Sequence, residues 1–394
     1  MEMARIPAIV LTGGLATRMR PLSSDREKSM IAFMGRPLLL HLISLLRSYG
    51  FSNIVFTSPG KRGDVEQYFS DGRDYDVNIG YYRDGKWYGT AGTTKKLVCQ
   101  MGDRAASDNL LVVYGDSLLK ADLDKMLQFH SRTKSWCTIL YHRPKFESFV
   151  YEYHDSAFDE LGKRTNYGAM DIDRDGRITA FVEKPTIAQL ENEFINPVAN
   201  AVVYAIRKDA LEYVPEDCSC DFPQHLFPLL IKKGMPCFGF DIGDGYRLDI
   251  GTLPTYYTAQ LAILHGKVDF DLDFPRLEEG VWIGGTSTVD PTGKLERPVL
   301  ICESSRIGPG TRIESSIIGN NVHVGGSCVV EGSIILDNAH IGKGVQISYS
   351  IIGEDCSVDN GVVLPPNTVL GNYCHLGDSQ LALRDSDFYG LIRG

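Results

Sequence analysis

The stretch IPAIVLTGGLATRMRPLSSDREK, residues 6–28, decides how this chain begins to fold. Its apolar run, residues 6–11, is typical of a strand buried in an α/β sheet. Two adjacent glycines follow, and glycine lets the backbone turn with φ > 0 and bring its N–H groups close to a ligand. Arg18, Arg20 and Lys28 add positive charge. The stretch predicts a strand and a loop that holds a polyanion, with an ordinary strand-to-helix turn and solvated basic side chains as the alternative.

This loop differs from the two commonest phosphate-binding loops. No Gly-Lys-Ser/Thr follows four residues after a glycine, and Gly-x-Gly-x-x-Gly is absent. The loop resembles instead the signature of the sugar-1-phosphate nucleotidyltransferases, Gly-Gly-x-Gly-Thr-Arg-x-x-Pro-Leu-Thr followed by Pro-Lys. The residues that match this signature are Gly13, Gly14, Thr17, Arg18, Pro21, Leu22 and Lys28.

Three positions depart from that signature. They are Ala16 at the third glycine, Ser23 for threonine, and Glu27 for the proline before the lysine. If the Ala16 position needs φ > 0, its Cβ costs about 1 kcal/mol or more, so we expect a slightly reshaped loop. The resemblance implies two sets of contacts: with the nucleotide by Leu11, Gly13 and Gly14, and with the triphosphate and leaving pyrophosphate by Arg18 and Lys28.

Length and composition predict a two-domain protein. A chain of 394 residues is long enough for two domains. Its formal net charge of −10 argues against general nucleic-acid binding, so phosphate recognition must be local. The nine cysteines are scattered and include no Cys-x-x-Cys pair, which favours reduced thiols. Because neither a secretory signal nor a sufficiently apolar span is found, we expect a cytoplasmic protein that does not associate with membranes.

Up to about residue 265, apolar strand-like runs alternate with helical patterns. The expected strands are 6–11, 53–58 and 110–113, and the expected amphipathic helices are 37–49 and 122–133. This alternation predicts an α/β fold with a Rossmann-like, mostly parallel sheet covered by helices on both faces. Ligands of such sheets lie at the carboxyl ends of the strands, where the glycine loop is expected.

After residue 280 the sequence repeats with a step of 17 residues. The step links Arg-Ile-Gly at 306, His-Val-Gly at 323 and His-Ile-Gly at 340, and it also links Ile313, Val330 and Ile347. Three apolar positions per unit at one fixed step describe a triangular coil with an inward residue on each side. This pattern predicts a parallel β-helix, and it resembles the left-handed hexapeptide-repeat helix.

The alternating pattern and the 17-residue repeat divide the chain into four parts. We expect a nucleotidyltransferase-like domain at 1–265, a linker at 266–280, the left-handed β-helix at 281–378 and a tail at 379–394. A short β-helix of four to five coils leaves a flank exposed, which predicts packing against the first domain and a homodimer or higher homo-oligomer. His323 and His340 should stack on adjacent coils as a solvated ladder, with acetyl transfer by the β-helix as a remote alternative.

Two carboxylates are candidate magnesium ligands. Asp116 ends the strand-like Leu-Val-Val-Tyr-Gly-Asp at 111–116, although a plain turn would have the same sequence. Asp249 lies in Arg-Leu-Asp-Ile-Gly-Thr at 247–252, which resembles the family's Trp-x-Asp-Ile-Gly-Thr, and a salt bridge is its alternative role. Magnesium prefers one or two carboxylates together with phosphate oxygens and water. The resemblance implies that Asp116 and Asp249 jointly hold Mg²⁺.

A predicted hairpin carries the candidate sugar-phosphate residues. Asn-Tyr-Gly-Ala-Met-Asp-Ile at 166–172 and Phe-Val-Glu-Lys-Pro at 181–185 flank a turn. The resemblance assigns the sugar hydroxyls to Gly168 and Glu183 and the 1-phosphate to Lys184, although a surface ion pair would look the same in isolation. Asn-Ala-Val-Val-Tyr at 200–204 resembles the family's Asn-Ala-Gly-Ile-Tyr strand, so Asn200 joins this set. Val202 replaces a glycine, which argues against an ordinary hexose.

The segment Trp-Tyr-Gly-Thr-Ala-Gly-Thr at 87–93 resembles the Leu-Gly-Thr-Ala-Gly segment that contacts the base in guanylyl-type members. It implies nucleotide contacts for Gly89, Thr90 and Gly92. Uridylyltransferases carry a similar Gly-Thr-Ala, and a plain loop before a helix that starts near Thr93 is the alternative. The N-terminus of that helix would favour an anion or a polar acceptor.

The resemblance covers essentially the whole chain and is closest to the GDP-mannose pyrophosphorylase group. It implies Mg²⁺-dependent transfer of a nucleotidyl group from a nucleoside triphosphate, GTP favoured, to a mannose-1-phosphate-like sugar or cyclitol phosphate. The same reaction with UTP or dTTP and glucose-1-phosphate is one alternative. A catalytically inactive paralogue that binds a nucleotide-sugar and regulates a partner is another, since Ala16, Glu27 and Val202 are the departures it predicts.

Overall fold

The computed structural model describes residues 6–13, 17–58, 63–83, 85–86, 88–102, 107–143, 164–165, 167–216 and 218–377. The chain divides into two compact units. The first comprises Met1–Gly13 and His41–Arg247, and the second comprises Gly14–Leu40 and Leu248–Gly394. The segment after the first strand therefore belongs to the same unit as the C-terminal part of the chain. The domain limits expected from the sequence stay predictions.

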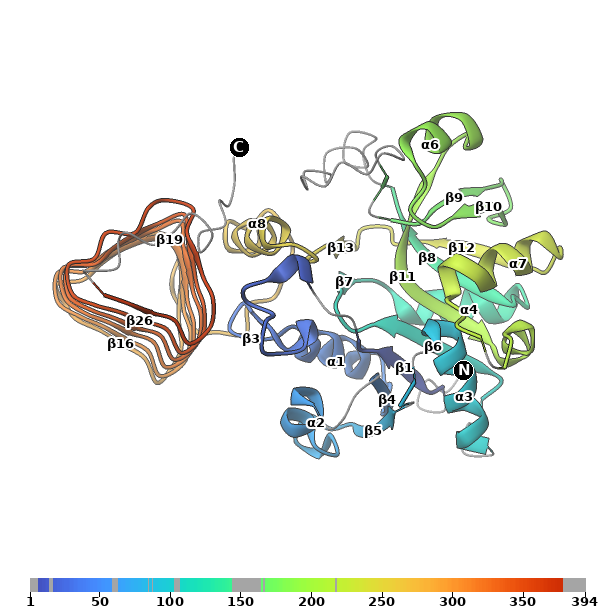
Figure 1. Ribbon diagram of the computed structural model, residues 1–394, viewed down its shortest axis with the longest axis horizontal. Coiled ribbons are helices and arrows are strands. Elements are labelled where there is room, and N and C mark those ends of the chain that lie inside the picture. Colours follow the sequence, from blue (N-terminus) through green and yellow to red (C-terminus); the bar gives the residue numbers. More distant parts are fainter. Residues whose placement is uncertain are drawn as a thin grey trace. The chain divides into compact units, whose positions relative to one another are not determined.

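Within the described residues, the first unit is built on a nine-stranded mixed sheet (Figure 1). Its parallel part has the order β6-β1-β4-β5, formed by β6 (Asn109–Tyr114), β1 (Ala8–Leu11), β4 (Asn53–Ser58) and β5 (Asn78–Arg83). The other strands are β8 (Cys137–His142), β9 (Ala169–Ile172), β10 (Ile178–Val182), β11 (Val198–Arg207) and β12 (Cys237–Asp241). Strand β11 runs antiparallel to β6, β8 and β9. The predicted mostly parallel α/β sheet is confirmed, and β9 and β10 form the predicted hairpin.

Both faces of this sheet are buried. Ile9 and Leu11 pack into one core with residues of α3 and α7, whereas Val10 points to the opposite face and is equally buried. Such two-sided burial explains why β1 is a continuous apolar run. The helices that begin or lie in this unit are α1 (Leu38–Ser48), α2 (Asp64–Phe69), α3 (Gly89–Met101), α4 (Leu123–Arg132), α6 (Ile187–Glu193) and α7 (Phe227–Lys232). The predicted helices 37–49 and 122–133 correspond to α1 and α4.

Short elements complete the first unit. Strand β7 (Leu118–Lys120) pairs with β13 (Tyr246–Leu248) in a separate two-stranded sheet. Short helical segments are η4 (Arg73–Tyr75), η6 (Lys208–Tyr213) and η7 (Phe222–Leu226), of which η7 is π-helical. Helix α4 begins at Asp122, whose side chain accepts a hydrogen bond from the Lys125 N–H at 3.0 Å. Asp122 is thus the N-cap of α4, and its side chain satisfies one of the free N–H groups of the first turn.

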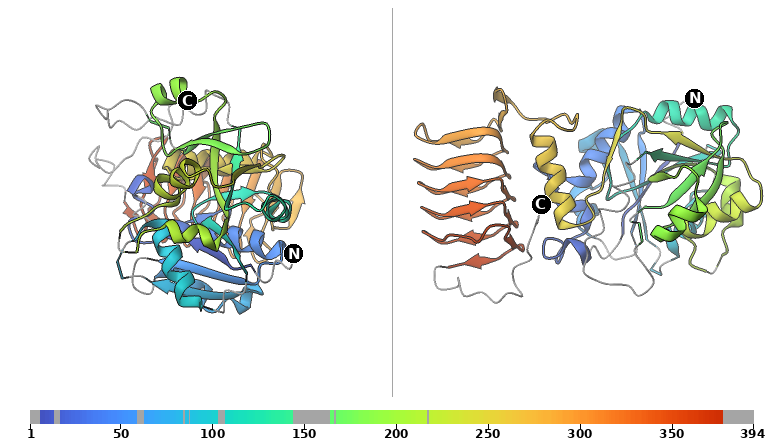
Figure 2. Two further views of the ribbon diagram at one scale, coloured as in Figure 1. Left: turned by 90° about the vertical axis from the view of Figure 1, so that its right-hand side faces the viewer. Right: turned by 90° about the horizontal axis from the view of Figure 1, so that it is seen from above.

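The second unit contains a parallel β-helix whose coils trace a triangle in Figure 1 and stack side by side in Figure 2. Equivalent residues of successive coils are direct partners: Arg306 pairs with His323, and His323 pairs with His340. The predicted step of 17 residues is thus the length of the central coils, whereas the first and last steps are 18 residues, as from Val281 to Val299 and from Ser357 to His375. The strands are β14 (Arg276–Glu278), β15 (Val281–Ile283), β16 (Thr288–Val289), β17 (Lys294–Ile301), β18 (Arg306–Ile307), β19 (Arg312–Ile318), β20 (His323–Val324), β21 (Val329–Glu331), β22 (Ile334–Ile335), β23 (His340–Ile341), β24 (Gln346–Ser348), β25 (Ile351–Ile352), β26 (Ser357–Val358), β27 (Val369–Leu370) and β28 (His375–Leu376).

Left-handed residues mark one corner of five successive coils. They have φ between 54° and 61° and recur in step with the repeat, at Ser304, Asn321, Asn338, Asp355 and Tyr373. Asn and Asp tolerate this conformation better than most residues, which explains their recurrence in the sequence. The rings of His323 and His340 stack with centroids 4.8 Å apart and an interplanar angle of 12°, as predicted.

A ladder of buried hydroxyl groups runs through the coils and was not predicted. The Ser316 hydroxyl accepts the Ser333 N–H at 3.0 Å, and the Ser333 hydroxyl accepts the Ser350 N–H at 3.0 Å. The Ser350 hydroxyl in turn accepts the Thr368 N–H at 3.1 Å. These serines are buried, so the ladder satisfies backbone donors that water cannot reach.

Residues 17–40 pack on the β-helix. They include η2 (Thr17–Met19), η3 (Lys28–Met30), β2 (Ala32–Phe33) and β3 (Arg36–Pro37). The Asn320 side-chain amide donates to the Gly35 carbonyl at 2.9 Å, and a Cβ at Gly35 would lie 2.4 Å from Sγ of Cys302. Helix α8 (Leu253–Leu264) packs on the same coils, where the Tyr257 hydroxyl donates to the Gly332 carbonyl. None of the helices in the described ranges is both long and apolar enough to cross a membrane.

Candidate active site

Strands β1 and β6 end side by side in the first unit. Leu11 is the register partner of Tyr114, and the Gly115 N–H donates to the Leu11 carbonyl at 3.0 Å. Beyond these ends lie Gly13, which has φ +150°, and the half-buried Asp116. The structure therefore brings Leu11, Gly13 and Asp116 to the edge of the sheet where α/β folds bind ligands. Two residues expected nearby, Gly14 and Ala16, lie outside the described residues, as does Trp87.

The hairpin brings Gly168 and Glu183 together, as the sequence predicts. A Cβ at Gly168 would lie 2.6 Å from a carboxylate oxygen of Glu183 and 2.9 Å from the Phe181 ring. Only glycine allows this close approach. The Asn200 N–H donates to the Gly168 carbonyl at 2.9 Å, so all three candidate sugar-binding residues lie in one cluster.

The Asn200 side chain is almost fully buried, with 2% exposure, and it is partly engaged within the chain. Its Oδ1 accepts the Val202 N–H at 2.9 Å, and its Nδ2 donates to the Tyr204 hydroxyl at 2.9 Å. One amide hydrogen and one lone pair remain for a ligand. Asn200 therefore shapes the cluster as well as being a candidate contact.

Val202 occupies a conformation that suits glycine. Its φ is +56°, and the register of β11 against β8 is irregular between Asn200 and Tyr204. For a β-branched residue a positive φ is a genuine outlier. The glycine usual at this position in the family pattern would adopt the same backbone without strain, so Val202 is a local cost that this chain retains.

Glu183 is the buried charge of the cluster. Burial raises the pKa of its carboxyl, and the neighbouring Asp221 raises it further, whereas Lys184 and Arg247 oppose the shift. Lys184 is exposed and has φ +47°. The pair thus presents one buried hydrogen-bond acceptor and one solvated cation, which suits a ligand with hydroxyl groups and a phosphate.

Helix α3 begins at Gly89, one turn earlier than the start near Thr93 that the sequence predicted. The first-turn N–H groups of Ala91 and Gly92 donate to the Cys220 carbonyl at 2.9 and 3.0 Å. The Thr90 N–H donates to Oδ1 of Asp221 at 2.9 Å. These caps from a distant segment extend the helix backwards, an effect that local sequence cannot reveal. The polar acceptors expected at this helix N-terminus thus come from the chain itself.

Tyr114 and Asp221 link these groups and were not singled out in the sequence. Tyr114 shares a hydrogen bond with Thr90, and burial raises the pKa of its hydroxyl together with the charges of Glu183, Asp221 and Asp116. The three carboxylates are therefore close enough to act on one phenol. Tyr114 could have been found from its place directly before the Gly-Asp pair. Asp221 carries no comparable signal, because its contact with Thr90 joins distant parts of the sequence.

The second unit gathers the other candidate charges around Gly251. A Cβ at Gly251 would lie 2.9 Å from Oδ1 of Asp249, 3.5 Å from Nη2 of Arg18 and 3.7 Å from Nζ of Lys28. The Gly251 N–H also donates to that same Asp249 oxygen at 2.8 Å. Residues distant in sequence thus place two cations and one carboxylate around a position that has no side chain.

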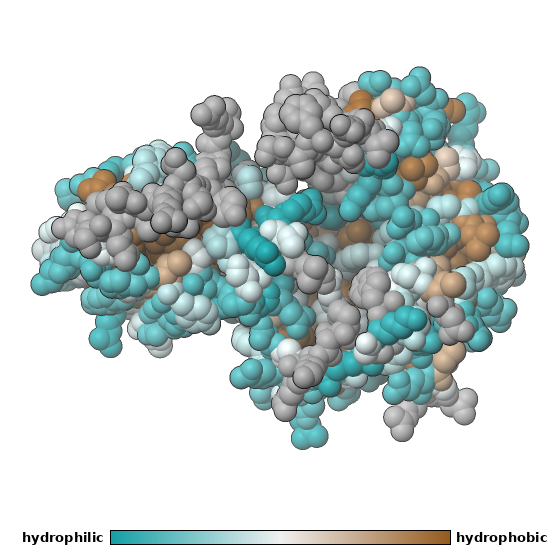
Figure 3. Space-filling model, in the orientation of Figure 1, coloured by the Kyte–Doolittle hydropathy of each residue, from teal (hydrophilic) through white to brown (hydrophobic). Residues whose placement is uncertain are grey.

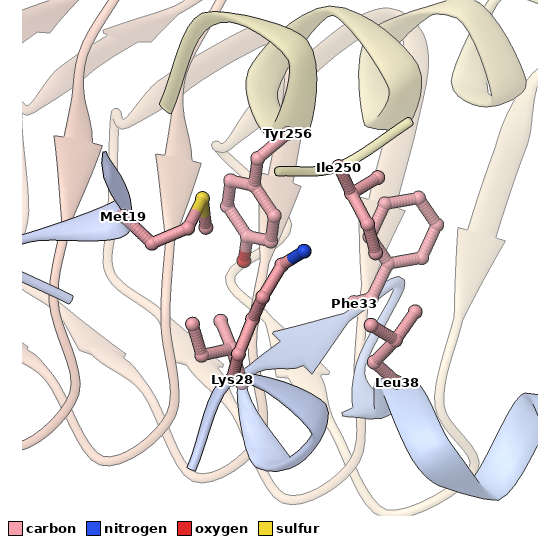
Figure 4. A pocket seen from close by; sticks show the side chains of 7 residues that line it. Met19, Lys28, Phe33, Leu38, Ile250 and Tyr256 are labelled. Carbon is pink, nitrogen blue, oxygen red and sulfur yellow. The ribbon is translucent and has the colours of Figure 1, made fainter. Parts of the chain in front are cut away.

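Lys28 reaches this position through an apolar pocket of the second unit. Figure 4 shows its ammonium group extending from the η3 turn toward Tyr256 and Ile250. Met19, Ile31, Phe33 and Leu38 complete the lining. Glu27, which replaces the family's proline, has φ −68°. Because proline imposes nearly the same φ, this substitution preserves the backbone that presents Lys28.

The candidate metal ligands lie in different units, Asp116 in the first and Asp249 in the second. In the ranges that the structure describes, no group of three or more His, Cys, Asp or Glu side chains could hold a metal ion. Two carboxylates remain, and Asp249 uses one oxygen for the Gly251 N–H. Each carboxylate by itself offers the hard oxygen donors that magnesium prefers.

Comparisons with known proteins agree with the fold. The family model described as nucleotidyl transferase matches residues 7–266. A second model, described as the EIF2B subunit epsilon LbH domain, matches residues 278–381. The chain therefore belongs to the nucleotidyl transferase family and carries a C-terminal left-handed β-helix.

Curated relatives narrow the class of reaction. A UTP–glucose-1-phosphate uridylyltransferase of Synechocystis is 27% identical over 79% of this chain and 86% of its own length. A mannose-1-phosphate guanylyltransferase of Mycobacterium tuberculosis is 26% identical over 84% of each chain. Glucose-1-phosphate adenylyltransferase 2 of Vibrio cholerae is 27% identical over 82% of this chain and 87% of its own length. This chain is accordingly a sugar-1-phosphate nucleotidyltransferase, and its relatives differ in both base and sugar.

Proposed function

We propose that this protein transfers a guanylyl group from GTP to a mannose-1-phosphate-like acceptor, with Mg²⁺, and releases pyrophosphate. The convergence of Arg18, Lys28 and Asp249 around Gly251 carries the proposal, because these are the charges that a metal-bound triphosphate requires. The Gly-Thr-Ala-Gly segment at 89–92 and the guanylyltransferase of Mycobacterium tuberculosis favour GTP. The uridylyltransferase of Synechocystis keeps UTP with glucose-1-phosphate as the alternative.

The chemistry that these residues would perform is positioning and charge stabilisation. A phosphate oxygen of the acceptor attacks the α-phosphorus of the nucleotide, and the bond to the pyrophosphate oxygen breaks. The attacking oxygen is already anionic, so no general base is needed. Lys184 would hold the acceptor phosphate while Glu183, Gly168 and Asn200 orient the sugar. Arg18 and Lys28 would bind the triphosphate and stabilise the charge that develops on pyrophosphate.

Asp116 and Asp249 would hold the magnesium ion. Both side chains are half-buried carboxylates, and the hard oxygen donors they offer are those that magnesium prefers. When bound, the ion would neutralise charge on the phosphate oxygens. The nucleotide would be contacted by residues of two segments: Leu11, Gly13 and Gly14 of the glycine loop, and Gly89, Thr90 and Gly92 at the start of α3.

The substrate pair can be identified by a matrix assay. GTP, UTP, dTTP and ATP are each combined with mannose-1-phosphate, glucose-1-phosphate and a cyclitol phosphate, and pyrophosphate release is measured. We expect GTP with a mannose-1-phosphate-like acceptor to react fastest. Lys28→Ala should lower the rate about 10²–10³-fold, whereas Lys343→Ala, an exposed change on the β-helix, should leave it unchanged. Nucleotide-sugar binding without pyrophosphate release from any pair would instead support the inactive regulatory paralogue.

We also propose that the protein forms a homo-oligomer through its β-helix. Figure 3 shows a mostly hydrophilic described surface with apolar residues in separate patches. Four large apolar side chains on the described part of the β-helix are nevertheless exposed, Leu277, Tyr349, Val363 and Tyr373. Exposed apolar groups of this kind suit a contact with a second copy. A monomer in light scattering at micromolar concentration would contradict this proposal.

A further inference from the structure

Arg247 is a half-buried cation, and two of its nitrogens have no hydrogen-bond partner among the described residues. It is the central residue of β13, and its Nε and Nη1 atoms are inaccessible to solvent and make no hydrogen bond in the part of the chain that the structure describes. The guanidinium stacks over the Tyr167 ring, with its central carbon 4.8 Å from the ring centroid. Stacking holds the plane of the guanidinium against the ring, so the N–H groups at its edge stay available for hydrogen bonds to other groups.

A second unpartnered nitrogen lies beside this arginine. His142 packs edge-on against the other partner of the stack, with ring centroids of His142 and Tyr167 5.7 Å apart at 86°. Its Nε2 is also buried and has no hydrogen bond among the described residues. Burial and the charge of Arg247 lower the pKa of His142 to about 4, so the imidazole is neutral at physiological pH. A neutral imidazole beside a cation offers one more hydrogen bond without adding charge.

These groups border the sugar-phosphate cluster. Tyr167 directly precedes Gly168, and His142 is the register partner of Ala199, which directly precedes Asn200. The charge of Arg247 reaches Glu183, whose pKa it lowers against the effect of burial. All of them belong to the first unit. The unpartnered nitrogens are thus next to the residues proposed to orient the acceptor.

Buried polar groups that lack partners are rare and costly. A guanidinium deprived of water loses stability unless charged or polar acceptors replace the water. Among the described residues, no carboxylate forms an ion pair with Arg247. A ligand that enters the cluster would supply the acceptor that the described residues do not provide. In the family pattern Trp-x-Asp-Ile-Gly-Thr, the tryptophan falls on Arg247, so this cation is a property of the present chain.

We propose that Arg247 determines acceptor specificity by binding an anionic oxygen group on the sugar, in addition to the 1-phosphate that Lys184 holds. The group is a carboxylate or a second phosphate, since both match the two-pronged donor geometry of arginine. His142 would add a hydrogen bond to the same group. This inference rests on the proposed function, because it concerns the acceptor of the same reaction.

The test compares acceptors with and without a second anionic group. A hexose-1-phosphate, a hexuronic acid 1-phosphate and a hexose-1,6-bisphosphate are titrated calorimetrically without nucleotide, and their KM values are measured with GTP and Mg²⁺. We expect one of the doubly charged acceptors to bind about 10- to 100-fold more tightly than the hexose-1-phosphate. Preference for the uronic acid identifies a carboxylate partner, and preference for the bisphosphate identifies a phosphate partner.

Variants assign that preference to the guanidinium. Arg247→Gln should abolish it, Arg247→Lys should retain part of it, and the KM for GTP should stay unchanged in both. Arg207→Gln is the matched control, because Arg207 stacks on Trp136 at 4.3 Å and ends β11 far along the strand from Asn200. Equal binding of all acceptors by the unmodified protein, or an equal loss for all of them in Arg247→Gln, would overturn the inference. Tight binding of a doubly charged acceptor without pyrophosphate release would uphold it and reject the proposed reaction.

Discussion

Arg26 forms an ion pair with Glu354 of the β-helix through its Nη1, and both side chains are mostly buried, with exposures of 15% and 13%. The contact does not stand alone. The Asn372 side-chain amide donates to Oδ1 of Asp25 at 2.7 Å and to the Leu22 carbonyl at 3.1 Å. The segment between Arg18 and Lys28, on which the triphosphate role is proposed, is therefore held by two successive coils of the β-helix.

Breaking this ion pair should weaken nucleotide binding. Glu354→Gln keeps the shape of the side chain but removes its charge beside a buried guanidinium, so we expect destabilisation of about 1.5–3 kcal/mol. We also expect the KM for the nucleoside triphosphate to rise several-fold while the KM for the sugar phosphate is unchanged. Denaturant unfolding and steady-state kinetics measure the two effects.

Glu331→Gln serves as the control for that change. Glu331 lies on the same β-helix and accepts a hydrogen bond from the exposed Tyr349 hydroxyl at 2.7 Å, away from the Arg26 contact. In the contrary outcome, Glu354→Gln and Glu331→Gln each raise the KM for the nucleotide and the KM for the sugar phosphate by the same factor. That result would mean that the β-helix stabilises the protein but does not position the segment between Arg18 and Lys28. A double-mutant cycle with Arg26→Gln isolates the coupling of the pair itself.

The bare backbone at Gly251 should be needed for activity. Gly251→Ala would place a methyl group 2.9 Å from Oδ1 of Asp249, so the carboxylate or the nearby cations must move. A small misplacement of charged groups can cost about a hundredfold in rate, and we expect a loss of 10- to 100-fold in kcat. Gly285→Ala, where a Cβ would meet nothing within 4 Å, is the neutral comparison. Full activity of Gly251→Ala would show that the cluster tolerates displacement.

Replacing Val202 by glycine should stabilise the protein. Its φ of +56° costs an L-residue about 1–3 kcal/mol, which glycine avoids at the expense of unfolded-state entropy. We expect the free energy of unfolding to rise by about 1 kcal/mol. Val203→Gly, at the next and fully buried position of the same strand, should instead be strongly destabilising. A similar loss of unfolding free energy in both variants would mean that the side-chain contacts of Val202 stabilise the protein by more than its positive φ destabilises it.

Acid should destabilise the first unit through its buried histidines. His130 is held by Thr138 at Nδ1 and Asn109 at Nε2, at 2.8 and 3.2 Å, and burial, aided by Arg207, lowers its pKa to about 4. In the unfolded chain this histidine titrates near 6.5, so below that pH the unfolded state binds the extra proton first. Stability is complete above pH 6.5 and falls as the pH drops toward 4, by about 2 kcal/mol between pH 6.5 and 5.

Unfolding free energies measured between pH 7.5 and 4.5 test this expectation. His130→Gln removes the titrating group, so the slope of stability against pH should be shallower by the contribution of one proton. His142→Gln should act in the same direction, since the pKa of His142 is also lowered to about 4. Unchanged slopes in both variants would place the acid sensitivity in other groups.

The sequence predicts this fold well where side-chain direction follows a period. The 17-residue step specifies the coils because the inward positions must be apolar, and Asn321 and Asn338 mark corners that require positive φ. The strands 53–58 and 110–113 are equally readable as buried apolar runs. The start of α3 is not predictable locally, because its caps at Cys220 and Asp221 come from a segment distant in sequence.

The residues of the candidate site differ in the same way: some could be predicted from the sequence, and others could not. Gly168 and Glu183 are readable because a hairpin joins neighbouring stretches, and the structure brings them together. Asp221 and Arg247 are not, because a contact between distant segments and unpartnered buried atoms arise from the fold rather than from spacing. The strain at Val202 is also invisible in sequence, since valine is an ordinary strand residue unless its φ is known.

The packing of residues 17–40 on the β-helix bears on how this architecture can be altered. A C-terminal domain without contacts to the rest of the chain could be removed or exchanged. Here the β-helix instead contacts residues 17–40, which lie near the start of the sequence. Shortening the protein after residue 265 would leave Gly35, Leu22 and Tyr257 without their partners. A change to these coils of the β-helix is therefore also a change to the surroundings of residues 17–40, which include Arg18 and Lys28.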